Sequence, residues 1–246
     1  MFTFKQFSVQ NDGAAFKVGT DAVLLGSAAS LVGNEVRILD AGTGTGIIAL
    51  MLAQRLSAIS ADADFYIDGI DADAASADEA TLNFGGSPWA KHLNARHLSL
   101  EELAKSSPEA YDLVISNPPY FENSLLNPDQ KRRTARHAFE DSLSWRSLMD
   151  FSVKYLAASG RLIMILPSDI AGKAIAAASA PESPLSISRI LNIKTNSGKP
   201  ATRAIIEMCR TAASDRKTEV RELVIQEGGE YTPAYKALTK DFHPFL

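Results

Sequence analysis

Cysteine is nearly absent from this chain of 246 residues, in which Cys209 is the only one. A single cysteine cannot form an internal disulfide, so a disulfide-stapled secreted domain is excluded and a reducing cytoplasm is favoured. Cys209 ends the apolar run 204–209, which predicts a buried core thiol. No apolar run reaches the length of a membrane span, and the first residues lack the pattern of a signal or transit peptide. We therefore expect a cytoplasmic protein without a membrane partner.

Metal-ligand spacing is also missing. The four histidines, His92, His97, His137 and His243, are scattered along the chain and form no zinc-type pattern. The sequence therefore predicts no metal site.

An excess of positive charge is lacking too, because the formal net charge is −4. This counts against a general nucleic-acid binder, whose electrostatic footprint is usually basic. The charge is unevenly distributed, however. Residues 62–79 carry seven acids and no base, whereas residues 189–203 carry four bases and no acid. A second basic cluster consists of Lys131, Arg132, Arg133 and Arg136, so a local nucleic-acid surface stays open.

The order of the apolar segments is typical of an α/β protein. Segments with the length and composition of strands lie at 36–40, 65–71, 93–98, 111–115 and 161–167. Helical stretches alternate with them at 47–56, 74–83, 144–156 and 168–178. Strands near 187–193 and 204–208 are typical of the hairpin that closes such a sheet, and the tail holds a candidate strand at 220–225. We predict a mostly parallel seven-stranded sheet with helices on both faces.

The N-terminal residues 1–30 are expected to form a β-hairpin and a short helix. Residues 2–18 alternate apolar and polar around an Asp-Gly turn at 11–13, and Thr20 or Asp21 is expected to cap a helix at 22–29. The chain has no internal repeat and no clear linker, so we predict one domain over 1–246, with a core and C-terminal tail over 31–246. The strand-free stretch 121–142 has a length that usually marks a functional or disordered loop.

A glycine-rich loop, residues 41–46 (Ala-Gly-Thr-Gly-Thr-Gly), follows the first predicted strand and precedes a helix. Such a turn lets the backbone approach a bound nucleotide closely. The spacing Gly-x-Gly-x-Gly after an acid, Asp40, differs from the Gly-x-Gly-x-x-Gly that fits a pyrophosphate. The Asp40 carboxylate repels a diphosphate and attracts the ammonium of a methionine moiety. The loop therefore favours S-adenosylmethionine over NAD, which makes a dehydrogenase the weaker interpretation.

The second predicted strand ends in another acid, Asp71. A carboxylate at this place can accept hydrogen bonds from both hydroxyls of a ribose. Asp73, two residues later, is expected to cap the following helix. Asp71 is therefore the candidate for ribose binding.

The motif Asn117-Pro118-Pro119-Tyr120 follows the fourth predicted strand. Its two prolines end the strand, because neither can donate to a ladder and each fixes its own φ. The corner presents Asn117 and Tyr120 at the carboxyl end of a strand, where ligands bind in open α/β sheets. The Asn117 amide oxygen and the Pro118 carbonyl can accept both hydrogens of a weakly nucleophilic amine. The Tyr120 ring can stack on a planar base.

Asn-Pro-Pro-Tyr resembles the signature of S-adenosylmethionine-dependent methyltransferases that modify exocyclic or amide nitrogens. Residues 19–26 (Gly-Thr-Asp-Ala-Val-Leu-Leu-Gly), residues 135–137 (Ala-Arg-His) and the tail 231–242 are similar to the bacterial family that methylates N6 of adenosine 37 in a valine tRNA. The similarity spans nearly the whole chain. It implies a Rossmann-like methyltransferase fold, S-adenosyl-L-methionine as cofactor and the anticodon stem-loop of a tRNA as partner.

The resemblance also implies roles for individual residues. The residues implied to hold the cofactor are Asp21, Asp40, Gly42, Gly44, Gly46 and Asp71, with Ser99 where the family often has an acid near the adenine. Those implied to orient the flipped base are Asn117, Pro118, Pro119 and Tyr120. The tRNA phosphates are expected to meet Lys131, Arg132, Arg133, Arg136 and His137, with Arg189, Lys194 and Lys199 as further candidates.

Other acceptors and one other class of function stay open at this point. The acceptor could be an adenine of ribosomal RNA or DNA, or a glutamine amide in a protein, although the protein-modifying enzymes usually carry an added N-terminal helical domain. A non-catalytic RNA-binding protein on a methyltransferase scaffold is the alternative of another class. A monomer or a weak homo-oligomer is expected.

Overall fold

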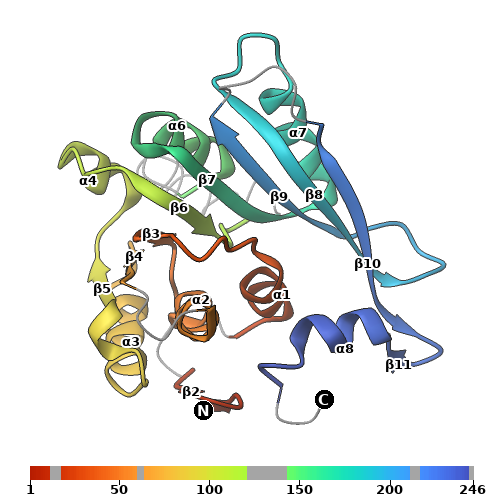
Figure 1. Cartoon of the computed structure of the whole chain (residues 1–246), viewed down its shortest axis with the longest axis horizontal. Helices are drawn as coiled ribbons and strands as arrows, with labels where there is room; N and C mark the ends of the chain where they lie inside the picture. The colour runs from red at the N-terminus through yellow and green to blue at the C-terminus, as the bar shows by residue number, and fades with distance from the viewer. Residues whose placement is uncertain (12–17, 60–63, 121–142, 211–216, 244–246) are drawn as a thin grey trace, which may run out of the picture.

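A nine-stranded sheet runs through the centre of the computed structural model, which describes residues 1–11, 18–59, 64–120, 143–210 and 217–243 (Figure 1). The strands of this sheet are β3 (Arg37–Ala41), β4 (Tyr66–Asp71), β5 (Leu93–His97), β6 (Tyr111–Ser116), β7 (Leu156–Pro167), β8 (Leu185–Asn196), β9 (Arg203–Arg210), β10 (Glu219–Glu227) and β11 (Glu230–Tyr231). Their order across the sheet is β11-β10-β8-β9-β7-β6-β3-β4-β5.

The sheet divides into a parallel part and a mixed part. Strands β5, β4, β3, β6 and β7 run parallel, whereas β9 lies antiparallel between β7 and β8. The seven predicted strands are β3 to β9, and the tail adds β10, parallel to β8, and β11 at the edge. Strand β3 lies between β4 and β6, so the chain leaves it first to one side and later to the other. Ligands bind at such a switch point, beyond the carboxyl ends of the strands.

Helices cover both faces of the sheet (Figure 1). One face carries α1 (Thr20–Ala28), α2 (Ile47–Ile59) and α3 (Ala74–Gly85), and the other carries α4 (Leu100–Lys105), α6 (Trp145–Tyr155) and α7 (Ser168–Ala178). Each face has its own apolar cluster. Neighbouring strand residues alternate between the two, so Ile38 packs in one cluster and Leu39 in the other. A 3-10 turn, η1 (Ala90–His92), precedes β5.

The N-terminal hairpin is shorter than predicted. Strands β1 (Phe2–Thr3) and β2 (Ser8–Val9) pair antiparallel, and the Phe4 amide donates to the Phe7 carbonyl at 2.8 Å in the turn between them. The turn of this hairpin is therefore not at the Asp-Gly dipeptide, which lies outside the described residues. The physical reason is apolar: the Phe4 and Phe7 rings stack at 4.7 Å, and both are buried.

The start of α1 also differs from the prediction. Gly19 is the N-cap residue, and neither Thr20 nor Asp21 caps the helix through its side chain. Asp21 instead lies in the first turn and is free to bond elsewhere. By contrast, Asp73 caps α3 as predicted, because its Oδ2 accepts from the Ser76 amide at 2.9 Å.

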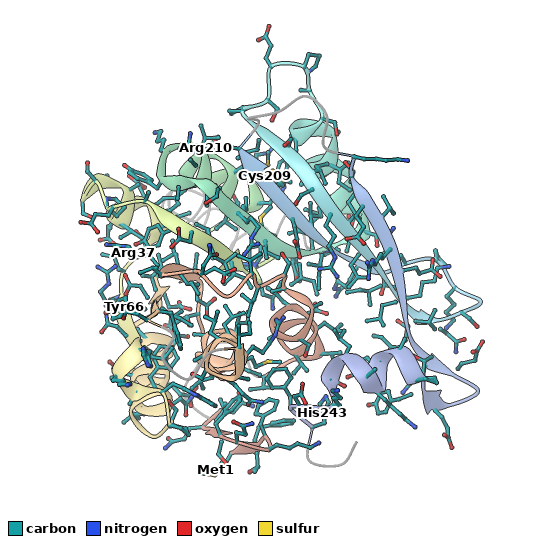
Figure 2. All side chains as sticks on the ribbon, in the orientation of Figure 1. Met1, Arg37, Tyr66, Cys209, Arg210 and His243 are labelled. Carbon is teal, nitrogen blue, oxygen red and sulfur yellow. The ribbon has the colours of Figure 1, made fainter. Side chains whose placement is uncertain are left out.

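The two ends of the described chain meet on one side of the molecule, beside α1 and α2 (Figure 1). The Lys5 amide donates to the Phe242 carbonyl at 3.0 Å, and the terminal helix α8 (Pro233–Thr239) contacts α1. Cys209 is buried near the end of β9, next to Arg210 (Figure 2). No described helix is both long enough and apolar enough to span a membrane.

Candidate active site

A cavity of about 870 Å³ lies at the carboxyl ends of the parallel strands. Four groups of residues that line it follow β3, β4, β5 and β6, namely 42–45, 71–73, 98–100 and 117–120. The start of α1, the start of α2, Ile70, Ser76 and Leu143 also contribute to the lining. A volume of this size suits a nucleoside-sized ligand. The segments that the sequence marks as the glycine loop and the Asn-Pro-Pro-Tyr corner therefore border one space.

The glycine loop has a backbone that only glycine adopts without strain. Gly42, Gly44 and Gly46 have φ values of 72°, 54° and 79°. Its amides are tied to the next strand, because the Gly42 and Thr43 amides both donate to the Ile70 carbonyl at 2.9 Å. A Cβ built on Gly44 meets nothing within 4 Å. The loop thus leaves an open cradle at Gly44, which fits the close approach of a cofactor.

Gly46 has a packing role. It does not line the cavity, and a Cβ built on it would lie 2.4 Å from Cε1 of Phe84 on α3. Its place is thus one of packing, where the start of α2 passes close to an aromatic ring. The cofactor-binding role of Gly46 stays a prediction beside this packing role.

Asp40 is set back from the cavity, beneath the glycine loop. Its side chain is fully buried and does not line the space. Oδ2 accepts from the Thr43 hydroxyl at 2.8 Å and from the Ala49 amide at 3.3 Å, while Oδ1 is buried with no hydrogen-bond partner among the described residues. Burial raises the pKa of Asp40 from 3.8 to about 7, although the bonds from Thr43 and Ala49 oppose the rise. An unpartnered buried carboxylate oxygen fits a cationic group of a ligand, such as the ammonium of S-adenosylmethionine.

Asp71 lines the cavity at the end of β4, as the ribose-binding role requires. Its Oδ2 accepts from the Gly44 amide and its Oδ1 from the Asp73 amide, each at 2.9 Å. Each carboxylate oxygen can accept a further hydrogen bond. Burial raises the pKa of Asp71. The carboxylate is therefore held in place by two backbone donors and retains capacity for hydroxyls.

Ser99 lines the cavity, but its side chain is already engaged. It caps α4 through a capping box, in which Ser99 Oγ donates to Glu102 Oε2 at 2.8 Å and accepts from the Glu102 amide at 3.2 Å. Leu98 and Leu100 line the cavity on either side of it. These two side chains offer apolar contacts for an adenine ring, whereas the Ser99 hydroxyl and amide both donate to Glu102 Oε2.

The Asn-Pro-Pro-Tyr corner is anchored to the glycine loop. Ser116, just before the motif, is buried and donates from Oγ to the Ala41 carbonyl at 2.7 Å. Asn117, Pro118, Pro119 and Tyr120 all line the cavity. The Tyr120 hydroxyl donates to Asn117 Oδ1 in a short hydrogen bond and lies 3.3 Å from the Ile165 carbonyl. Burial raises the pKa of Tyr120, and the charge of Asp21 adds to the rise, so the hydroxyl stays a neutral donor.

Asp21 reaches the same corner from α1. Its Oδ2 accepts from Arg203 Nε at 2.8 Å and lies 3.4 Å from the Tyr120 hydroxyl. The guanidinium carbon of Arg203 also lies over the Tyr120 ring, 5.5 Å from its centroid. The sequence analysis missed Arg203 as a site residue. It had counted only as one base of a basic stretch, and nothing local links it to an acid 182 positions away.

The structure describes only some of the basic residues that are predicted to bind phosphates. Lys131, Arg132, Arg133, Arg136 and His137 lie outside the described residues. Arg189 is occupied, because its Nη1 donates to Glu207 Oε1 at 2.7 Å and to the Ala28 carbonyl at 2.8 Å. Arg189 therefore forms a structural ion pair with Glu207, and its contact with a phosphate stays a prediction. Lys194 pairs with Glu222 at 2.8 Å, while Lys199 is exposed on the β8–β9 connection.

The described residues include no group of three or more His, Cys, Asp or Glu side chains that could hold a metal ion.

Comparison with known protein families gives consistent matches. The Methyltransferase small domain family matches residues 16–176. A protein named tRNA1(Val) (adenine(37)-N6)-methyltransferase from Flavobacterium johnsoniae is 38% identical over 99% of this chain and 99% of its own length. A protein of the same name from Parabacteroides distasonis is 41% identical, over 98% of this chain and 97% of its own.

Solved structures resemble the fold. A predicted O-methyltransferase from Agrobacterium tumefaciens aligns with a TM-score of 0.63 at 18% identity, over 90% of this chain and 96% of that one. The methyltransferase subunit of a type I restriction-modification system from Streptococcus thermophilus aligns with a TM-score of 0.52 at 18% identity, over 86% of this chain and 48% of that one. At such identities, these likenesses extend to the fold alone.

Proposed function

The chain belongs to the tRNA1(Val) (adenine(37)-N6)-methyltransferase family, and from this premise we propose that it transfers a methyl group from S-adenosylmethionine to N6 of adenosine 37 in the anticodon loop of a valine tRNA. One structural observation supports the proposal. The glycine loop, Asp71 and the Asn117–Tyr120 corner border the same cavity. A cofactor held by the first two would therefore lie beside an amine held by the third.

The proposed cofactor-binding groups divide by the part of the ligand that each suits. Asp71 would hold the ribose hydroxyls, and Leu98 and Leu100 would flank the adenine. Asp40, behind the glycine loop, would attract the ammonium through its charge, and Asp21, which lines the cavity, would lie near that end. S-adenosylmethionine supplies an electrophilic methyl group on a sulfonium when it is bound. Because that leaving group is good, alignment matters more than a strong base.

The proposed base-binding groups are those of the corner. Asn117 Oδ1 and the Pro118 carbonyl would accept the two hydrogens of the adenine N6 amine, and the Tyr120 ring would stack on the flipped base. The bond from the Tyr120 hydroxyl does not block this role, since a carbonyl oxygen has two lone pairs. That bond also fixes which way the amide faces, so Oδ1 points toward the tyrosine. The amine proton is then free to leave to water.

The wider organisation is also proposed rather than established. We take residues 1–246 as one domain, with the hairpin and α1 as an N-terminal part. The described residues that border the cavity all come from one chain, which supports action as a monomer or weak homo-oligomer. The anticodon stem-loop is the expected contact region on the tRNA, and the cytoplasm is the expected location, as the single cysteine favours.

Transfer of a labelled methyl group to valine tRNA transcripts tests the function. Two transcripts are compared that carry adenosine or guanosine at position 37, and labelled nucleosides are then separated. Label only in the adenosine transcript, as N6-methyladenosine, is the expected result. Equal labelling of both transcripts would move the target elsewhere in the RNA. No labelling of either, despite binding of S-adenosylhomocysteine, would contradict the tRNA assignment and favour ribosomal RNA, DNA or a protein amide.

A further inference from the structure

Four side chains from three separate parts of the fold meet at the corner of the cavity. Asn117 and Tyr120 come from the end of β6, Asp21 from the first turn of α1, and Arg203 from the start of β9. The contacts form a chain from Arg203 to Asp21, from Asp21 to the Tyr120 hydroxyl, and from that hydroxyl to Asn117. Asn117 and Tyr120 belong to the sequence motif, whereas Arg203 does not.

Arg203 is itself held firmly by the backbone around it. It is the first residue of β9, and its Cα partner is Pro167, the last residue of β7. Its Nη1 donates to the Thr202 carbonyl at 3.0 Å, and its Nε donates to Asp21. Burial disfavours its charge, but the bond to Asp21 and the charges of Asp21, Tyr120 and Asp169 together outweigh burial and raise the pKa of Arg203. The guanidinium therefore stays charged in a single orientation.

The same guanidinium contacts the tyrosine ring. It lies over one face of Tyr120, which leaves the other face as the one on which a base can stack. A planar guanidinium suits this place better than an ammonium, because it can pair with a carboxylate at its edge and stack on a ring with its face. Among the described residues, the other polar contacts of Tyr120 are those of its hydroxyl, with Asp21, Asn117 and Ile165.

We propose that Arg203 is a positioning residue for the methyl transfer, which backs the Tyr120 ring and fixes Asp21 so that the flipped adenine meets a tyrosine held in one orientation beside Asn117. This inference rests on the proposed function. It assigns to β9 a part in base presentation that the Asn-Pro-Pro-Tyr motif alone does not supply. Arg203 touches neither the reacting nitrogen nor the methyl group in this role.

The obvious rival role for a basic residue here is a direct phosphate contact. Two observations disfavour it. The charge of Arg203 is already paired with Asp21 at 2.8 Å, and the side chain is only 34% exposed. The neighbouring bases Arg189 and Lys194 are paired with acids as well. A phosphate would therefore have to compete with a carboxylate already in place.

Steady-state kinetics on the full-length protein with the adenosine-37 transcript separates the two roles. Arg203→Lys keeps the positive charge but replaces the planar guanidinium with an ammonium. We therefore expect kcat to fall about tenfold while KM for tRNA changes less than about threefold. Arg203→Ala should cost more in the wild-type background than in a Tyr120→Ala background, where the ring it supports is gone. The matched control is Arg221→Ala, which removes an exposed arginine paired with Glu219 on β10 and should leave both constants unchanged.

Three results would overturn the inference. These are a full wild-type kcat in Arg203→Lys, an equal loss from Arg203→Ala in both tyrosine backgrounds, or a loss confined to KM with a shallower salt dependence, which marks a phosphate contact. Absence of transfer by the wild-type protein would instead count against the proposed function.

A measurement without substrate tests the inference even if the wild-type protein transfers no methyl group to the tRNA. Nuclear magnetic resonance of the free protein with isotope-labelled tyrosine should show the Tyr120 ring signal shifted in Arg203→Lys and unshifted in Arg221→Ala. An unmoved Tyr120 signal in Arg203→Lys would contradict the proposed support of the ring.

Discussion

The cofactor side and the base side of the cavity are held together in different ways. On the cofactor side, backbone fixes the geometry: glycine φ values are positive, and amides of the loop bond to Ile70 and Asp71. On the base side, side chains fix it, through the contacts of Asn117, Tyr120, Asp21 and Arg203. The first side should therefore be sensitive to any added atom, and the second to the loss of particular functional groups.

The largest expected effect belongs to Asn117, the only amide side chain that lines the described cavity. Asn117→Ala should lower kcat by about a thousandfold, because removal of a preorganised acceptor leaves the amine unoriented. Asn117→Asp serves as the matched variant, since a carboxylate still accepts from the amine and from Tyr120. Transfer should be partly retained in Asn117→Asp. Equal activity of Asn117→Ala and the wild type in the tRNA assay would remove Asn117 from the reaction.

A smaller loss is expected from a single methyl group at Gly46. Gly46→Ala adds a Cβ at a φ of 79° and 2.4 Å from Phe84, so the loop must shift. We expect the free energy of unfolding to fall by about 1–3 kcal/mol and affinity for S-adenosylhomocysteine to fall at least about tenfold.

Gly172→Ala is the control for this change, because its Cβ in α7 meets nothing within 4 Å. It should stabilise the protein by roughly 0.5–1 kcal/mol, as expected for alanine in a helix interior, and leave affinity unchanged. Urea unfolding and calorimetry measure both quantities. Similar behaviour of the two variants would show that the loop is not tightly packed at Gly46.

The effect of Asp40 depends on pH. Its pKa in the folded protein is about 7, above the ordinary 3.8, so its contribution to stability is fully present below about pH 4 and is lost as pH rises toward 7. Asp40→Asn does not titrate, and its stability advantage over the wild type should therefore grow over this range and level off above pH 7. Urea unfolding of both proteins at several pH values checks this sign.

Affinity for the cofactor should rise with pH, whereas the contribution of Asp40 to stability falls with pH. The charged carboxylate is the form that attracts an ammonium, so wild-type affinity for S-adenosylhomocysteine should rise roughly three- to tenfold from about pH 6 to about pH 7.5. Asp40→Asn should bind more weakly and with little of this dependence. A wild-type affinity that is flat across this range would mean that Asp40 does not face the ammonium.

The contrast between the two sides also explains what could be predicted from sequence. The alternation of strands and helices, the glycine loop and the proline corner are local patterns, and they led directly to β3–β9 and to most of the cavity lining. Asp73 was recognised as a cap because its partner is only three residues away. Features that depend on residues close together in the sequence can thus be predicted from it.

The features that sequence reasoning missed depend on distant partners. In the sequence, Gly46 is indistinguishable from the other loop glycines, and its close contact with Phe84 is visible only in the structure. Arg189 and Arg203 look like equivalent members of one basic stretch, yet the first pairs with Glu207 and the second with Asp21. The turn between β1 and β2 is marked by stacking of Phe4 on Phe7, whereas the predicted Asp-Gly turn lies outside the described residues. Tertiary contacts decide all of these cases.

Calorimetric titration of S-adenosylhomocysteine into Asn117→Ala and Asp71→Asn tests the division of the cavity most directly. Asp71→Asn turns one acceptor oxygen into a donor facing a backbone amide, so affinity should fall at least about tenfold. Asn117→Ala should bind the ligand within about threefold of the wild type while failing to methylate tRNA. An Asn117→Ala protein that loses affinity as severely as Asp71→Asn would contradict the assignment of Asn117 to the base rather than to the cofactor.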